Sequence, residues 1–162
     1  MHLDLVARVR TVPGWAAWQQ RAGTNDGHAN TAVLLRSSLG LRDAGQRFLV
    51  DSADTRRRYV TWATLASGLT VAAAHLPPAR DKADLPAALA NLRRFARAHR
   101  RGGLVIGLDS NTDQHGPLEH ATGLTWAGTG IDGFLTNLGQ HGLHQLDRRY
   151  SDHHPLVTTL TS

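Results

Sequence analysis

Three short segments carry most of the acidic and imidazole groups that could do chemistry, and each borders an apolar run. The first segment, residues 107–111, reads Gly-Leu-Asp-Ser-Asn and follows the apolar residues 104–106. If residues 104–106 form a strand, its two-residue period places Asp109 and Asn111 on the same side. A carboxylate beside a neutral amide can activate a water molecule and hold a phosphate oxygen. The alternative interpretation is an ordinary turn, because Asp, Ser and Asn all favour turns.

The other two segments are residues 130–135, Gly-Ile-Asp-Gly-Phe-Leu, and residues 151–156, Ser-Asp-His-His-Pro-Leu. Strands disfavour Asp, and a buried carboxylate needs a charged or hydrogen-bonding partner, so Asp132 is a candidate site residue or else a strand cap. Asp152 beside His153 can supply a metal-binding carboxylate and a general base. The alternative is an exposed turn, which is the role we expect for His154.

The elements that must position these groups follow from the apolar pattern. Residues 2–20 are predicted to form two short helices interrupted by Pro13 and Gly14, and residues 21–29 to form a loop. The helical spacing of Leu85, Leu92 and Phe95 predicts a helix that ends before Gly102. Strands are predicted at residues 31–35, 47–50, 59–65, 71–76, 104–106, 131–135 and 155–160. Strands on both sides of a helix predict an α/β (α+β) sandwich, with an antiparallel meander before the helix.

Composition limits the possible partners and metals. The chain has 162 residues, 41% of them hydrophobic, which suits a single domain spanning residues 1–162. It contains no cysteine, so any metal must be held by oxygen or imidazole donors, which favours magnesium or manganese. The net charge of +5 and the pI of about 10.9 favour a nucleic-acid partner, although an arginine-rich composition alone gives the same charge. We see no signal peptide and no spanning apolar run, so we expect a cytoplasmic protein without membrane contact.

Taken together, the motifs resemble the endonuclease/exonuclease/phosphatase superfamily, whose fold is that of deoxyribonuclease I. Residues 107–111 resemble its Gly-Asp-x-Asn motif, and residues 130–135 resemble its Ile-Asp-tyrosine-Ile-like motif. Residues 151–156 match its terminal Ser-Asp-His-x-Pro motif in full. Residues 74–77 and 30–36 resemble two further strands, with Ala74 replacing a Thr and Ala29 a Gly. The resemblance implies a β-sandwich flanked by helices.

The resemblance also implies the chemistry, which is water attack on a phosphate ester. Asp109 would orient or deprotonate the water, and Asn111 would hold a phosphate oxygen. His153 would contact the scissile phosphate or share the acid–base work. Asp132 would hydrogen-bond the imidazole of His153 and fix its tautomer. His75 would be a further donor near the phosphate.

Binding roles follow in the same way. Asp152 would help to bind Mg²⁺ or Mn²⁺, and Arg148, Arg149 and Asn30 would bind the substrate. The implied protein is a metal-dependent phosphodiesterase, with nuclease activity on DNA or RNA as the expected form. The remaining arginines, at positions 93, 94, 97, 100 and 101, are interpreted as the solvated face of the helix that begins near Leu85. Tryptophans 15, 18 and 62 are assigned to the core, and Trp126 is placed in a loop, where either a core or a site role stays open.

The chain departs from the superfamily at its start, where the resemblance implies an Asn strand and a Gln-Glu strand whose Glu is the principal metal ligand. Neither segment is found, so the chain corresponds to the C-terminal two-thirds of the fold, N-terminally truncated. Three explanations stay open: the gene starts upstream, the protein is a truncated form of low or no activity, or another carboxylate replaces the ligand. The candidates for that replacement are Asp4, Asp26 and Glu119, the last of which is predicted to lie in the loop after Asp109. The competing function is therefore a catalytically weak or inactive nucleic-acid-binding domain. A histidine-based metal site is a third, weaker hypothesis.

Overall fold

The structure is a computed structural model of the whole chain, and it describes residues 11–19, 31–51, 57–78, 83–148 and 152–161. The side chains of Trp18 and Gln19 are not described. Asn30, Arg149, Asp4, Asp26 and the predicted loop at residues 21–29 lie outside these ranges.

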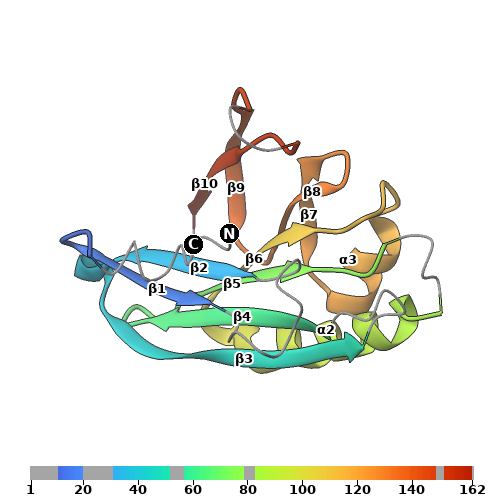
Figure 1. The fold of residues 1–162 in the computed structure, drawn as a ribbon, viewed down its shortest axis with the longest axis horizontal. Helices are drawn as coiled ribbons and strands as arrows, with labels where there is room; N and C mark the ends of the chain where they lie inside the picture. The colour runs from blue at the N-terminus through green and yellow to red at the C-terminus, as the bar shows by residue number, and fades with distance from the viewer. Residues whose placement is uncertain (1–10, 20–30, 52–56, 79–82, 149–151, 162) are drawn as a thin grey trace.

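A six-stranded mixed sheet forms the centre of the fold (Figure 1). In spatial order its strands are β3 (Leu41–Asp51), β4 (Arg57–Leu65), β5 (Thr70–His75), β6 (Leu104–Asp109), β8 (Asp132–Thr136) and β7 (Thr125–Thr129). The pairs β3–β4 and β4–β5 are antiparallel, which confirms the predicted meander. Only β5 and β6 run parallel among these strands, because a helix connects them, as parallel neighbours require.

Helix α2 (Leu85–His99) makes that connection and packs on one face of the sheet. Pro86 lies in its first turn, where the missing N–H is not needed. Its buried residues Ala88, Leu92, Phe95 and Ala96 join alternate residues of the strands, such as Leu104 and Ile106 of β6, in the larger core cluster. Short helices follow at Arg100–Gly102 (η2) and Gly116–Thr122 (α3), and another, η1, spans Ser37–Leu39. Of the helices that the structure describes, none is long and apolar enough to span a membrane.

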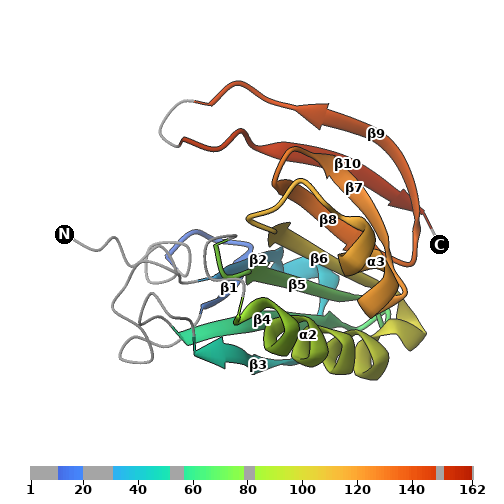
Figure 2. The same ribbon diagram turned by 90° about the vertical axis from the view of Figure 1, so that its right-hand side faces the viewer.

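Two small sheets lie on the other face of the six-stranded sheet. One pairs β1 (Trp15–Gln19) with β2 (Ala32–Arg36), and the other pairs β9 (Gly139–Gln145) with β10 (Leu156–Thr161). Within the described residues, β2 pairs only with β1 and β10 only with β9. The hairpin β9–β10 lies at the opposite end of the molecule from β3 (Figure 2).

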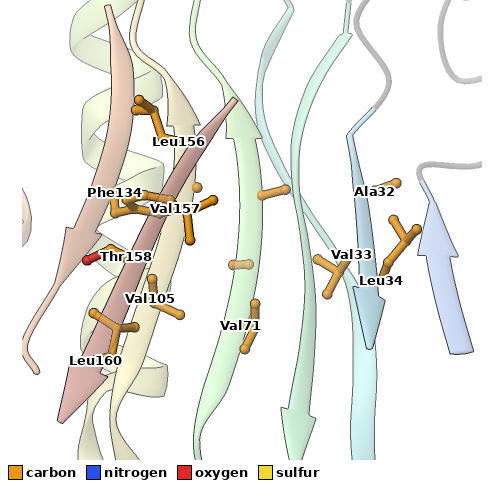
Figure 3. A pocket seen from close by; sticks show the side chains of 13 residues that line it. Ala32, Val33, Leu34, Val71, Val105, Phe134, Leu156, Val157, Thr158 and Leu160 are labelled. Atoms are coloured by element: carbon orange, nitrogen blue, oxygen red, sulfur yellow. The ribbon is translucent and has the colours of Figure 1, made fainter. Parts of the chain in front are cut away.

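A groove of about 450 Å³ lies between these two small sheets, above the six-stranded sheet. Val71 of β5, Val105 of β6 and Phe134 of β8 line it from the sheet, with β10 on one side and β2 on the other (Figure 3). Because strand side chains alternate between faces, Val71 and Val105 point into the groove while Ala72 and Ile106 belong to the core under α2. The β-sandwich flanked by helices is therefore present, with a groove in its second layer.

Three positional predictions were wrong. Trp15–Gln19 is a strand rather than part of a helix, because its backbone pairs with β2 from Trp15↔Arg36 to Gln19↔Ala32. The apolar spacing of Trp15 and Trp18 resembles a helical repeat, but pairing with a distant strand overrides it. Glu119 lies in helix α3 rather than a loop, and Trp126 lies in strand β7 rather than a loop.

Candidate active site

Strand register places three of the predicted site residues side by side. His75 is the partner of Asp109 in the parallel pair β5–β6, and Asp109 is the partner of Asp132 in the antiparallel pair β6–β8. All three therefore form one row across three adjacent strands. Asp109 and His75 end their strands and Asp132 begins its own, so the row lies at one edge of the sheet.

The same row lies on the groove side of the sheet. Asp109 is two residues beyond Gly107, His75 is two residues beyond Ala73, and Asp132 is two residues before Phe134. Gly107, Ala73 and Phe134 all line the apolar groove, and strand side chains keep one face at every second residue. A smaller pocket of about 290 Å³ contains Asp109 and Asp132 and shares Gly107, Phe134 and Leu156 with the groove. The apolar groove thus leads to the acidic row.

His153 approaches this row from the segment before β10. Its Nδ1 lies 2.7 Å from Asp132 Oδ2, a hydrogen bond short enough to be charge-assisted. The hydrogen bond to Asp132 raises the pKa of His153 above its ordinary value, burial opposes this, and the charges of Asp132, Asp109 and Asp152 add to the rise. The Asp132–His153 pair predicted from the motifs is therefore present, and Asp132 fixes the direction of the imidazole.

Asp109 is held at both carboxylate oxygens. Its Oδ1 accepts a hydrogen bond from the backbone N–H of Asn111 at 3.1 Å, and its Oδ2 lies 3.2 Å from His75 Nε2. Asn111 adopts a left-handed backbone with φ of 51°, which Asn tolerates better than most residues. The side-chain amide of Asn111 donates to the carbonyl oxygen of Leu76 at 2.8 Å, which ties β6 to the end of β5. The turn after β6 is thus ordered and presents Asp109 in a fixed orientation.

The donor set suits a hard cation. Asp109, Asp132 and His153 each offer one ligand atom, and these atoms lie within 4.8 Å of one another. Two carboxylates directly opposite in a sheet repel each other, and a divalent cation or the imidazolium of His153 would relieve that repulsion. The predicted metal ligand Asp152 lies beyond His153, with its Oδ1 3.9 Å from His153 Nε2 and 92% of its side chain exposed. It is adjacent to the three-residue cluster and is not one of its members.

The remaining predicted residues divide into three groups. Arg148 lies beside Asp152, and its Nη1 donates a hydrogen bond to the backbone oxygen of Asp152 at 3.1 Å. Glu119, one suggested replacement ligand, accepts a hydrogen bond from the backbone N–H of Trp126 at 2.8 Å and so joins α3 to β7. Arg149, Asn30 and the other suggested ligands, Asp4 and Asp26, lie outside the described residues.

Two features that hold the site residues in place were not predicted from the sequence. Ser110 is buried, and its hydroxyl lies 2.7 Å from the carbonyl oxygens of Thr112 and Ile131, which fastens the Asp109 turn to the start of β8. The indole of Trp126 stacks on His115 at 4.0 Å and packs on the core beneath the sheet, on the face opposite Asp132. A Cβ at Gly133 would lie 2.5 Å from the indole and 2.7 Å from the Ala127 carbonyl oxygen, so the packing of β7 against β8 requires glycine next to Asp132. No local sequence pattern predicts the hydrogen bond from Ser110 to Ile131, because the two residues are far apart in the chain. The Asp-Gly sequence at 132–133 can be seen in the sequence, but the packing that requires the glycine cannot.

Comparisons with known proteins agree on the fold. No protein-family model matches the sequence, and no curated protein matches it. Among solved structures, the mannosyl-6-phosphatase Bt3783 of Bacteroides thetaiotaomicron VPI-5482 is similar at a TM-score of 0.70 and 15% identity, over 99% of this chain and 82% of that one. An endonuclease/exonuclease/phosphatase family protein from Bacteroides thetaiotaomicron is similar at 0.69 and 14%, over 99% and 79%. TDP2 of D. rerio, complexed with a single-strand DNA product, is similar at 0.60 and 10%, over 94% and 76%. The fold predicted from the motifs is confirmed.

Proposed function

We propose, from the endonuclease/exonuclease/phosphatase fold that this chain has, that the protein is a metal-dependent phosphoesterase that hydrolyses phosphodiesters of nucleic acid. The observation that carries the proposal is the row of His75, Asp109 and Asp132 across three strands, with His153 hydrogen-bonded to Asp132 at 2.7 Å. An ordinary strand end does not need four ionisable groups this close together, and such clusters are typical of catalytic sites.

Each residue has a role that its contacts support. Asp109 is oriented by Asn111 and His75, so its carboxylate can position a water molecule for attack on phosphorus. His153, held by Asp132 and with a raised pKa, can donate a proton or hydrogen bond to a phosphate oxygen. Arg148, which donates to the backbone oxygen of Asp152, would contact a phosphate next to the site.

A divalent cation, Mg²⁺ or Mn²⁺, fits the donor set of Asp109 and Asp132, and Asp152, which lies outside this cluster, is the further ligand that the motif suggests. When bound, it would neutralise charge on the phosphoryl group and so lower the barrier to water attack. The Asp109–Asp132 pair carries this assignment, because the two carboxylates are opposite neighbours in the sheet.

Nucleic acid is the substrate class that the charge favours. The chain carries a net charge of +5, which attracts anionic substrates. Because the site itself is acidic, this attraction would come from basic residues around it. The neighbour TDP2 was solved with a single-strand DNA product, whereas Bt3783 is a mannosyl-6-phosphatase, so a sugar phosphate is the second candidate.

The test compares hydrolysis of bis(p-nitrophenyl) phosphate with nicking of a supercoiled plasmid, in magnesium, manganese or EDTA. We expect metal-dependent hydrolysis that falls by about 10²-fold or more in Asp109→Asn and in His153→Gln. Asp113→Asn and His141→Gln remove a matched exposed carboxylate and imidazole, and both should retain activity. Equal activity in the site variants and the controls would contradict the proposal. Metal-independent DNA binding without any turnover would instead favour the non-catalytic binding domain.

A further inference from the structure

The exposed side of α2 and η2 is unusually basic. Residues 85–108 contain no aspartate or glutamate. The arginines at positions 93, 94, 97, 100 and 101 are all exposed, and we call them the arginine face. The opposite side of α2 is buried in the core. The exposure of these arginines confirms the prediction that they form the solvated face of the helix. Exposure to solvent does not explain why this face carries positive charges and no negative ones.

The spacing of these arginines is unfavourable for the helix by itself. Arg93 and Arg97 are four residues apart and Arg94 and Arg97 are three apart, so like charges are neighbours on the helix surface. Each such pair costs about 0.2–0.5 kcal/mol. The helix dipole favours the cations in the last turn, yet Arg93 and Arg94 lie too far from the C-terminus to benefit. A bound anion would relieve the repulsion.

None of the five arginines forms an ion pair with a described carboxylate. Arg94 donates to the side-chain oxygen of Asn91, a neutral acceptor. By contrast, Arg57 on β4 lies 3.3 Å from Asp51, which shows the usual neutralised arrangement. The arginine face therefore presents positive charge outward.

A phosphate backbone fits this surface better than a membrane does. One guanidinium group can donate two parallel hydrogen bonds to two oxygens of a phosphate. A hollow of about 300 Å³ lies between Ala90 and arginines 93, 94 and 97. Arg93 and Arg97 are separated by about 6 Å along the helix axis, close to two phosphate steps of one DNA strand at about 3.4 Å each. A membrane-binding helix would carry exposed large apolar side chains, and among the described residues these all lie outside α2 and η2.

We propose that the arginine face binds the phosphate backbone of nucleic acid, at a site separate from the acidic row. The separation follows from the sheet, because α2 packs against the face that carries Ile106, whereas Asp109 lies on the groove face. The inference deepens the proposed function, since it names a second contact for the same class of substrate, but the binding itself needs no turnover.

The test is a salt titration of binding to a short fluorescein-labelled DNA duplex, in EDTA to prevent hydrolysis. In the variant Arg93→Gln/Arg97→Gln/Arg101→Gln, we expect weaker binding and a smaller slope of log K against log salt. The slope should fall by about 0.9 for each arginine that contacts a phosphate. The melting temperature should not fall, because the change removes repulsion within the helix. The matching lysine variant should restore most of the slope, which excludes damage to the fold as the cause.

Arg57→Gln, a change at an arginine already paired with Asp51, is the matched control and should leave the slope nearly unchanged. An unchanged slope in the triple variant would overturn the proposal, as would an equal loss in the control. Arginine-dependent binding to phosphatidylserine vesicles with unaltered DNA binding would also overturn it. Hydrolysis of bis(p-nitrophenyl) phosphate should persist in the triple variant. Arginine-dependent DNA binding without hydrolysis by the native chain would instead count against the proposed catalysis alone.

Discussion

The acidic groups around His153 raise the pKa of its imidazole. Asp132 accepts its Nδ1 hydrogen bond at 2.7 Å, while Asp109 and Asp152 add further negative charge nearby. These groups hold the proton on the imidazole to a higher pH than in a free histidine. A protonated His153 can stabilise negative charge on a phosphate. A neutral His153 could donate a hydrogen bond to that phosphate only from the ring nitrogen that carries the proton. The protonation of His153 therefore depends on Asp132.

Replacing Asp132 by asparagine should lower the pKa of His153. The strongest cause of the raised pKa, the hydrogen bond to a charged carboxylate, is removed while the shape is kept. Because the folded pKa of the native chain is raised, the pair stabilises the fold fully below the unfolded pKa of histidine, and that stability is lost as pH rises through the folded pKa. The Asp132→Asn variant should lack this part of the pH dependence. NMR titration of the His153 ring protons measures the pKa directly, and an unchanged value would contradict the assigned pair.

At the scale of the elements, register converts three separate sequence motifs into one site. The strands β5, β6 and β8 were predictable because each contains a short apolar run, and the helix α2 because its apolar residues recur at helical spacing. Asp109, Asp132 and His153 were predictable as candidate site residues, because they follow motifs that resemble those of a known family, and the structure brings them together. The pairing of β5 with β6 in parallel, which sets His75 beside Asp109, is a non-local property that no local pattern contains.

Other elements gave no usable signal. Helix α3 has seven residues and begins with Gly116 and Pro117, too short for a helical period to emerge. Strand β9 consists mainly of Gly, Gln and His and is held by pairing with β10. The burial of Arg58 at the start of β4 was also not expected, since arginine in a basic run is usually exposed. In each case a tertiary contact decides the structure.

The packing of β7 on β8 gives a prediction at the same scale. In Gly133→Ala, the new Cβ would lie 2.5 Å from Cζ2 of the Trp126 indole, so the stacked Trp126–His115 pair must move. Overpacking of this kind typically costs about 1–3 kcal/mol. Gly107→Ala is the matched control in the neighbouring strand β6, because the nearest atom to its Cβ is 3.8 Å away. Urea denaturation of both variants should show a loss of stability only in Gly133→Ala.

If Gly133→Ala were as stable as the control, the close approach of β7 and its Trp126 indole would not be what requires glycine beside Asp132. A second variant, Gly133→Ala with Trp126→Phe, removes the contact with the indole but keeps those at 2.7 Å to the Ala127 carbonyl oxygen and 2.8 Å to the Gly128 Cα, so it should recover only part of the lost stability. Because Asp132 is the neighbour of Gly133, the Gly133→Ala change should also weaken the hydrogen bond to His153, which NMR of His153 would detect.

For the whole molecule, charge is divided between the two faces of the sheet. The groove face ends in Asp109 and Asp132, while the helix face carries the exposed arginines of α2. Asp109 and Asp132 lie directly opposite each other in the sheet although the chain as a whole has a net charge of +5. The repulsion between the two carboxylates lowers the stability of this part of the fold. Such local cost is typical of sites whose geometry serves binding or catalysis rather than stability.

A divalent cation should therefore raise the stability of the whole fold, and Asp109→Asn should abolish that gain. In EDTA the Asp109→Asn variant should be at least as stable as the native chain, because the repulsion with Asp132 is removed and the oxygen that accepts from the Asn111 N–H is kept. With manganese at about 100 times its dissociation constant, linkage adds about 2.7 kcal/mol to the native chain. For a chain of this length that corresponds to a rise in melting temperature of roughly 5–10 °C. Calorimetry with and without manganese measures the shift, and Asp113→Asn should show the same shift as the native chain. Equal shifts in the Asp109→Asn variant and the native chain would place the metal away from this carboxylate, and no shift in the native chain would remove the metal from the proposed chemistry.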